Sequence, residues 1–456
     1  MQCLEACQRI DAAIGHARIL RPLARPNPDA RFASFRIGPT PYLINPEQAN
    51  QLQQMGQHLK SFYRAMEELY RLSKHGDVPQ FVAQYLDAGK PAWLVELAQA
   101  EAFRGQIPHI IRPDLLLTAD GWKATELDSV PGSMGLLSFF EQVYTDWPLV
   151  GAGRTAAAMA AALADLISPA EQAAIVVSDE CGGYRAETAW LSRHWQEAGL
   201  LIPTLRPEQL TIHNDQVRYQ GQRLLLIYRF FELFDLDNIP NAKELLYLGA
   251  RGKIKITPPP KPYLEEKMWF AFLHHPDLQG DWEQLLGREA LTCLQELIPP
   301  TWLLCRDPVA FAGGPLGSLA KLKQTSRRQR PYVLKPSGFS PLAWGGHGFS
   351  RGKDYTTGHW AKTIDDYLAL ASTSPYIIQA YQQSLPQIAR HYEHTSESIA
   401  TFEGKLRLCP YYFLQNEQIT LSGALATLVP LSKPIIHGMT DAVMVPTAVT
   451  NDSHQS

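Results

Sequence analysis

The sequence predicts an α/β protein, because strand-like and helical runs alternate between residues 169 and 258. Residues 173–177 form an apolar run typical of a buried strand, and residues 184–199 have the pattern of a helix that ends at a glycine. Strand-like runs follow at 201–205 and 223–228. This alternation favours a parallel sheet with helices on its faces.

Composition excludes several other classes of protein. Of the 456 residues, 45% are hydrophobic and 19% are charged, which is enough apolar surface for large cores and argues against disorder. The net charge of −3 gives no basic excess for a nucleic-acid partner. The longest apolar tract, 155–167, contains Asp165 and is shorter than the roughly 20 residues of a membrane span. We therefore expect neither nucleic acid nor membrane as a partner.

The cysteines and the N-terminus indicate a reduced, cytoplasmic protein. Six cysteines are dispersed along the chain without a Cys-x-x-Cys motif, so they do not form a disulfide framework. Residues 1–15 include Glu5 and Asp11 and lack a continuous apolar core, which argues against a signal peptide.

The order of predicted elements divides the chain into five regions. We expect an N-terminal helical segment (1–104), a hairpin region (105–168), an α/β layer (169–258), the main lobes (259–446) and a disordered tail (447–456).

The first two regions rest on clear periodicities. Residues 47–75 predict a long amphipathic helix, and residues 80–104 are also helical in pattern. Strands at 108–118 and 122–128 flank Asp120-Gly121, a turn signal, and a helix follows at 136–144. The residues spaced by three and four in the long helix are Leu52, Met55, Leu59, Phe62 and Met66.

Later elements are separated by a stiff connector. Three consecutive prolines at 258–260 mark a boundary. A helix is expected at 267–275, and the basic run 321–330 is interpreted as a solvated loop. Strands are predicted at 331–335, 376–379 and 406–414.

Three carboxylates in the hairpin region indicate a cation site. Glu126 and Asp128 share one face of a strand, where acidic residues are depleted. A three-residue loop at 119–121, with Gly121 left-handed, would pair Asp114 with Glu126 and add a third carboxylate. A two-residue loop at Asp120-Gly121 would instead pair Asp114 with Leu127 and turn it away.

Oxygen ligands of this kind suit Mg²⁺, which binds carboxylates together with substrate phosphates. Arg112 lies on the same face as Asp114, where its guanidinium could bind a phosphate or acyl-phosphate oxygen. A surface cluster of salt bridges is the alternative interpretation of these residues.

A second set of residues indicates phosphate binding. Lys335 ends an apolar strand, where an ammonium group requires an anion. The long loop after it contains Gly345, Gly346 and Gly348, whose backbone N–H groups could approach phosphate oxygens. An ordinary surface loop remains the alternative, and His347 within it is interpreted as solvated. The loop matches neither a Walker A motif nor a dinucleotide fingerprint.

In these motifs the chain resembles the circularly permuted ATP-grasp enzymes, including the glutathionylspermidine synthetase-like group. Arg-x-Asp followed twelve residues later by Glu-x-Asp, at Arg112, Asp114, Glu126 and Asp128, matches their metal signature, which precedes the lysine strand as in the permuted order. The segments 406–412 and 422–427 resemble the late strand pair. The resemblance covers roughly residues 40–430. Asp128 where many members have Asn, and Gly423-Ala424 in place of Gly-Gly, are departures.

The resemblance implies a fold and a set of ligands. The expected fold is a circularly permuted ATP-grasp with a Rossmann-like pre-grasp layer and an N-terminal helical segment. Asp114, Glu126 and Asp128 would bind Mg²⁺, and Arg112 would be catalytic. ATP would be bound by Lys267, Lys335, Gly345, Gly346, Gly348, Gln379, Ala380, Tyr381 and Arg407.

The implied activity is ATP-dependent joining of a carboxylate, small or peptidic, to an amine through an acyl phosphate. The sequence contains no amidase-type N-terminal domain, so synthesis of glutathionylspermidine itself is not supported. Two alternatives remain open: a nucleotide-binding protein without turnover that serves a biosynthetic cluster, and a metal-dependent hydrolase that uses no ATP. The sequence does not determine the oligomeric state.

Overall fold

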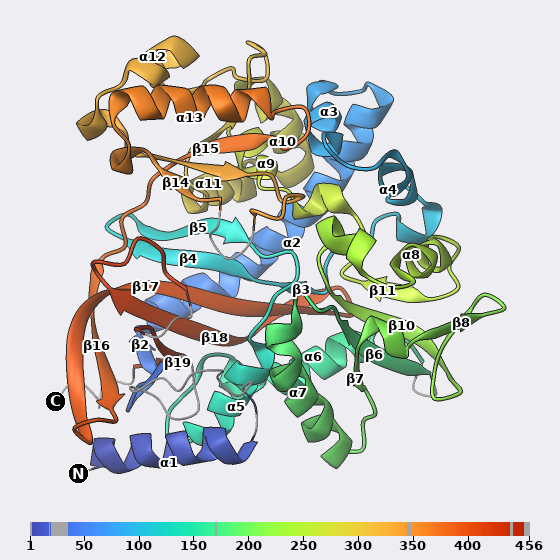
Figure 1. The fold of residues 1–456 in the computed structure, drawn as a ribbon, viewed down its shortest axis with the longest axis vertical. Helices are drawn as coiled ribbons and strands as arrows, with labels where there is room; N and C mark the ends of the chain where they lie inside the picture. Colours follow the sequence, from blue (N-terminus) through green and yellow to red (C-terminus); the bar gives the residue numbers. More distant parts are fainter. Residues whose placement is uncertain are drawn as a thin grey trace.

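The fold is described from a computed structural model that covers residues 2–17, 19, 35–168, 171–343, 348–437 and 441–450. The fold contains three β-sheets, and helices pack against each of them (Figure 1). The predicted loop glycines Gly345 and Gly346, together with His347, lie outside the described residues, as does the expected tail from residue 451.

The largest sheet has nine strands and joins both ends of the chain. Its main path runs β1-β19-β18-β17-β4-β5, with β16 and β3 paired to β17 and β2 paired to β19. The strands are β1 (Arg36–Ile37), β2 (Tyr42–Ile44), β3 (Ile110–Ile111), β4 (Pro113–Thr118), β5 (Gly121–Leu127), β16 (Pro386–Glu393), β17 (Ser398–Gln415), β18 (Gln418–Pro430) and β19 (Val443–Val449). The early hairpin and the late strands therefore form one sheet.

The second sheet confirms the expected α/β layer. Its order is β7-β6-β10-β9-β8, with β11 also paired to β10. The pairs of β6, β7, β10 and β11 are parallel, whereas β8 and β9 form an antiparallel hairpin at the edge. The strands are β6 (Gln172–Val177), β7 (Thr204–Leu205), β8 (Thr211–His213), β9 (Gln216–Tyr219), β10 (Gln222–Phe230) and β11 (Lys255–Thr257), and helices α7 (Arg185–Glu197) and α8 (Ala242–Ala250) accompany them.

The third sheet is small and antiparallel, in the order β12-β15-β13-β14. Its strands are β12 (Thr301–Leu304), β13 (Tyr332–Pro336), β14 (Ser350–Arg351) and β15 (Tyr376–Ala380). Helices α12 (Leu319–Gln324) and α13 (Thr357–Ala369) cover it around the buried Trp360, whose indole N–H donates to Leu322 O at 2.9 Å. Helices α9 (Met268–Leu273), α10 (Gln279–Leu286) and α11 (Arg288–Leu297) precede it.

The N-terminal region contains α1 (Gln2–Ala17), α2 (Pro46–His75), α3 (Phe81–Asp87) and α4 (Ala92–Leu97). The long helix α2 is confirmed; a capping box of Asn45 and Gln48 begins it and Gly76 ends it with φ of 86°. The helical pattern expected over 80–104 is present as the separate helices α3 and α4 and a short turn at Glu101–Phe103. The break falls where Gly89 adopts a φ of +74° and Pro91 follows it.

Two other expectations for the chain ends are corrected. The first 104 residues are not only helical, since β1 and β2 pair with β19 in the large sheet. Residues 447–449 are not a tail, because they form the end of β19 and pair with β2. Two- and three-residue strands show no periodicity of their own, so their partner strand determines them.

The core continues from the large sheet into the helices on both sides of it. Helices α5 (Met134–Val143) and α6 (Thr155–Ala164) pack against β17, β18 and β19. In the part of the chain that the structure describes, no helix is both long and apolar enough to cross a membrane.

Leu408, in the centre of β17, is fully buried, whereas Ile388 on β16 of the same sheet is 71% exposed. We expect Leu408→Ala to lower the free energy of unfolding by about 2–5 kcal/mol, because it leaves a cavity in the core. Ile388→Ala is the matched control and should change it by less than about 0.5 kcal/mol. Thermal unfolding of both variants measures the difference, and equal midpoints would contradict the described core.

Candidate functional site

A cavity of about 400 Å³ lies where the three sheets meet. Its walls include residues from β4, β5, β13, β15 and β17. The predicted site residues that line it are Arg112, Asp114, Glu126, Asp128, Lys267, Lys335, Gly348, Gln379, Ala380, Tyr381 and Arg407. The structure therefore brings the early acidic motif and the late lysines to the same cavity.

In the hairpin, Asp114 has the expected partner, but the register next to the turn differs from the predicted one. Thr118 pairs with Gly121 rather than with Trp122, so the predicted register next to the turn is wrong by one residue. A β-bulge at Thr125 then shifts the register, and Asp114 pairs with Glu126 as predicted. The loop prediction failed because the bulge, and not the turn, corrects the register.

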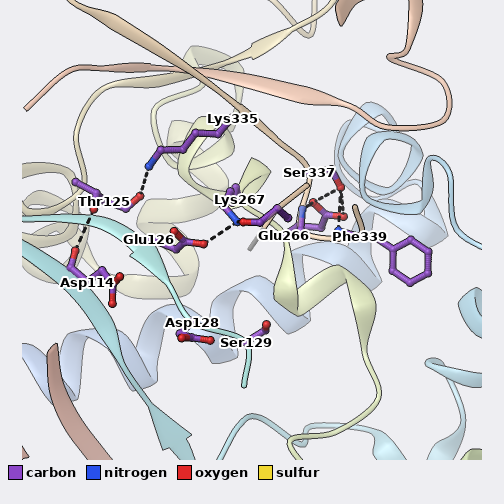
Figure 2. A network of polar contacts seen from close by, with 12 residues as sticks. Asp114, Thr125, Glu126, Asp128, Ser129, Glu266, Lys267, Lys335, Ser337 and Phe339 are labelled. Atoms are coloured by element: carbon purple, nitrogen blue, oxygen red, sulfur yellow. Dashed lines mark hydrogen bonds and ion pairs between the residues drawn. The ribbon is translucent and has the colours of Figure 1, made fainter. Parts of the chain in front are cut away.

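The bulged residue also contacts the lysine strand. Lys335 Nζ donates a hydrogen bond to Thr125 O at 2.8 Å (Figure 2). It donates a second one to Gln379 Oε1 at 3.0 Å. A bulge leaves a backbone group outside the strand ladder, so this carbonyl is available to the ammonium group. Lys335 is thus held between β5 and β15, which come from different sheets.

Lys267 links the same hairpin to the loop that follows β13. Its Nζ lies 2.7 Å from Glu126 Oε1 and donates to Ala343 O at 3.2 Å. Burial lowers the pKa of Lys267, but Glu126, together with Glu266 and Asp128, outweighs burial and the pKa is raised. Lys267 therefore stays charged.

Burial has the opposite outcome at Lys335. It lowers the pKa of Lys335 to about 8, and Glu126 opposes this only in part while Lys267 adds to it. Two ammonium groups thus face one cavity, and one of them can lose its proton just above neutral pH.

Asp114 is held by two arginines. Arg407 donates to its Oδ2 at 2.9 Å, Arg112 lies 3.2 Å from its Oδ1, and the Cys409 thiol also contacts Oδ1. Burial alone would raise the pKa of Asp114, but Arg407 and then Arg112 lower it to about 2. The carboxylate of Asp114 is therefore ionised and saturated by its neighbours.

The other two acids are less constrained. Asp128 pairs with Arg112 and accepts a hydrogen bond from the Val130 N–H at 3.1 Å, and burial raises its pKa despite the arginine. Glu126 is a third exposed at its side chain. Among the described residues, no three His, Cys, Asp or Glu side chains are arranged to hold a metal ion.

This donor set still fits Mg²⁺ in its chemistry, because that ion is usually held by one or two carboxylates together with phosphates. Glu126 and Asp128 provide two such carboxylates on one face of β5 and the residues after it. Asp114 as a third ligand stays a prediction, since its described contacts are with arginines and a thiol.

Several cavity residues were not recognised in the sequence. Glu232 and Glu265 line the cavity, and burial together with Glu265 raises the pKa of Glu232 to about 8. Glu265 is paired with Arg229, which is fully buried in β10. An arginine inside an apolar strand, and three consecutive charges at 265–267, are the signals that could have indicated this network.

The paired state of Asp114 predicts a pH dependence of stability. Its pKa in the folded protein lies below the ordinary value of 3.8, so its contribution is present above about pH 4 and is lost as pH falls towards 2. We expect Asp114→Asn to cost roughly 2 kcal/mol at pH 7, and this difference should shrink between pH 4 and pH 2. Denaturant unfolding of wild type and variant checks this.

Asp120→Asn is the matched control, because Asp120 is exposed at the turn of the same hairpin. Its effect should be near zero at all pH values. A cost for Asp114→Asn that does not vary with pH would contradict the arginine pairing.

The fold is similar to that of a solved glutathione synthetase-like protein. A glutathione synthetase-like effector from Globodera pallida, in its apo form, has a TM-score of 0.61 and 10% identity, covering 98% of this chain and 97% of that chain. A candidate gamma-glutamylcysteine synthetase from Methylobacillus flagellatus has a TM-score of 0.41 and 12% identity, covering 88% and 86%. No protein-family model and no curated protein matches the chain.

At these identities the likeness to the effector concerns the fold. It confirms the expected mixed α/β class, which the three sheets and their helices also show. The circular permutation stays a prediction from the order of the motifs.

Proposed function

We propose that the protein is an ATP- and Mg²⁺-dependent ligase that joins a carboxylate to an amine and releases ADP and phosphate. One observation carries the proposal: carboxylates of the early hairpin and lysines from after residue 260 line a single cavity. Both lysines contact the hairpin, Lys267 at the Glu126 carboxylate and Lys335 at the Thr125 carbonyl. A cavity lined by both acids and ammonium groups suits a triphosphate bound with a cation.

The nucleotide would lie between the small sheet and β5. Lys335 and Lys267 would neutralise its phosphates, and Arg407 would add a third cation. The backbone of 379–381 would contact the base, and Gly345, Gly346 and Gly348 would allow the loop to approach the phosphates. Gly348 and residues 379–381 line the cavity, which supports this assignment.

Glu126 and Asp128 would hold Mg²⁺, with Asp114 as the predicted third ligand. When bound, Mg²⁺ supplies the positive charge that neutralises the transferring phosphoryl group. Arg112 would then stabilise the acyl phosphate, since its guanidinium lies between Asp114 and Asp128 on the cavity wall. Whether or not it also binds Mg²⁺, Asp114 would orient Arg112 and Arg407.

The chemistry needs no protein nucleophile. A carboxylate oxygen of the acid would attack the γ-phosphorus and displace ADP, forming the acyl phosphate. The neutral amine would then attack the acyl carbon, the bond from that carbon to the bridging oxygen would break, and phosphate would leave with that oxygen while the nitrogen loses a proton. The protein's contribution is positioning, charge and exclusion of water, so that the amine reaches the acyl phosphate before hydrolysis does. We propose the circularly permuted order of ATP-grasp motifs, the five regions given above with their corrected ends, and a cytoplasmic location as parts of the same hypothesis.

A nucleotide-binding protein without turnover is the second candidate. It is favoured by the ion pairs of the motif, because each of its three carboxylates already has a cationic partner from the protein itself. A hydrolase without ATP is less well supported, because it assigns no role to Lys267 and Lys335.

Incubation with Mg-ATP and pooled amino acids, peptides and amines distinguishes these candidates. ADP release that depends on one amine and one acid supports the ligase. Nucleotide binding without ADP release supports the second candidate, and absence of nucleotide binding refutes both.

Glu126→Gln should reduce the rate of ADP release by about 10²–10³-fold, because it removes a charge that would hold the cation at the transferring group. Circular dichroism should show an unchanged fold, since the side chain is a third exposed. Asp120→Asn, in the same hairpin but away from the cavity, is the control for activity. A variant with near-normal turnover would refute the metal role of Glu126.

The pKa of Lys335 predicts how nucleotide affinity depends on pH. Its ammonium form prevails below about pH 8 and is lost above it, so ATP affinity should fall as pH rises through 8. We expect a loss of about tenfold between pH 7 and pH 9.5 in the wild type. Lys335→Arg keeps its charge throughout and should change by less than about twofold. Calorimetric titration with Mg-ATP measures both, and identical pH profiles would contradict the assignment.

A further inference from the structure

A buried carboxylate that the proposed chemistry does not use contacts the start of the glycine-rich loop. Glu266 accepts hydrogen bonds from Ser337 Oγ at 2.6 and 2.7 Å and from the Gly338 N–H at 2.8 Å (Figure 2). Its side chain is fully buried, as is that of Lys90, with which it forms an ion pair. Ser337 directly follows β13, so these bonds fix the direction in which the loop leaves the strand of Lys335.

Lys267, which follows Glu266 in the sequence, contacts the loop at a second point. Lys267 Nζ donates to Ala343 O at 3.2 Å, so two neighbouring residues bind the segment 337–343 near both of its ends. Gly338 packs directly on this support, because a Cβ at Gly338 would lie 2.0 Å from Glu265 O. Gly338 and Ala343 both line the cavity.

Lys90 comes from the N-terminal region, 176 residues away in sequence. It follows Gly89, whose φ is +74° and whose Cβ position would lie 1.8 Å from Thr373 O. Only glycine allows this approach to the turn before β15. The Gly89 turn thereby directs Lys90 into the lobe that carries the loop.

We propose that Glu266 is a positioning residue for the nucleotide and that Lys90 is its charge partner. Together they fix the start of the segment 337–343, so that Lys335 and Lys267 present their ammonium groups to the same phosphates. A carboxylate is needed here because it must accept from a hydroxyl and a backbone N–H while it neutralises a buried lysine. The expected effect of Glu266 on ATP binding rests on the proposed function. Its expected effect on the segment 337–343 rests on the described contacts alone.

Hydrogen exchange of the nucleotide-free protein and ATP kinetics test the proposal together. Glu266→Gln removes the charge of the carboxylate, and Gly89→Ala displaces Lys90 without altering any charge. Each should speed exchange within 337–343 at least about tenfold and raise the KM for ATP about tenfold. The KM for the amine should stay within about twofold, which a merely structural role would not produce.

Lys74→Met is the matched control, because Lys74 forms an exposed ion pair with Asp87 in the same region. It should change neither exchange in 337–343 nor the KM for ATP. If the two test variants instead speed exchange equally in all three sheets, or leave 337–343 and the KM for ATP unchanged, the positioning role is overturned.

The two proposals fail in different ways. If wild type does not bind ATP but both test variants loosen 337–343 selectively, the proposed function is refuted and the anchoring role of Glu266 is supported. If wild type turns over ATP and the variants behave like Lys74→Met, the function is supported and the positioning role is refuted.

Discussion

The hydrogen bond between the Lys335 ammonium and the Thr125 carbonyl joins two sheets that have no strand in common. Lys335 lies in the small sheet and Thr125 in the hairpin of the large one. The cavity exists only because these sheets face each other at this point. A buried ammonium group without acceptors would be costly, so the bulge that turns the Thr125 carbonyl towards Lys335 is part of the site's construction.

Ion pairs in the cavity also connect residues that are far apart in the sequence. Two acids of the early motif are paired with cations from a distant part of the chain, Asp114 with Arg407 and Glu126 with Lys267. The third, Asp128, is paired with Arg112 of the motif itself. Such pairs are weak evidence for stability, because desolvation offsets their attraction. They do hold charged groups in fixed directions inside a cavity, which is the arrangement needed for electrostatic stabilisation of transferring phosphoryl groups.

Sequence reasoning identified the groups that face the cavity and failed on the details that place them. Alternation along β5 was enough to put Glu126 and Asp128 on one face. The anion expected at Lys335 stays a prediction, since its described partners are the neutral oxygens of Thr125 and Gln379. The bulge at Thr125 was not predictable, because it compensates a turn whose register depends on tertiary contacts. The pair of Lys90 and Glu266 was missed because no local pattern connects residues 176 positions apart.

The position of β19 has a consequence for how the chain acquires its structure during synthesis. β19 lies between β18 and β1 and also pairs with β2, so β1 and β2 have no strand partner until residues 443–449 have left the ribosome. The edges of these two strands would meanwhile be open to pairing with other chains. The large sheet can therefore close only after β19 has been synthesised.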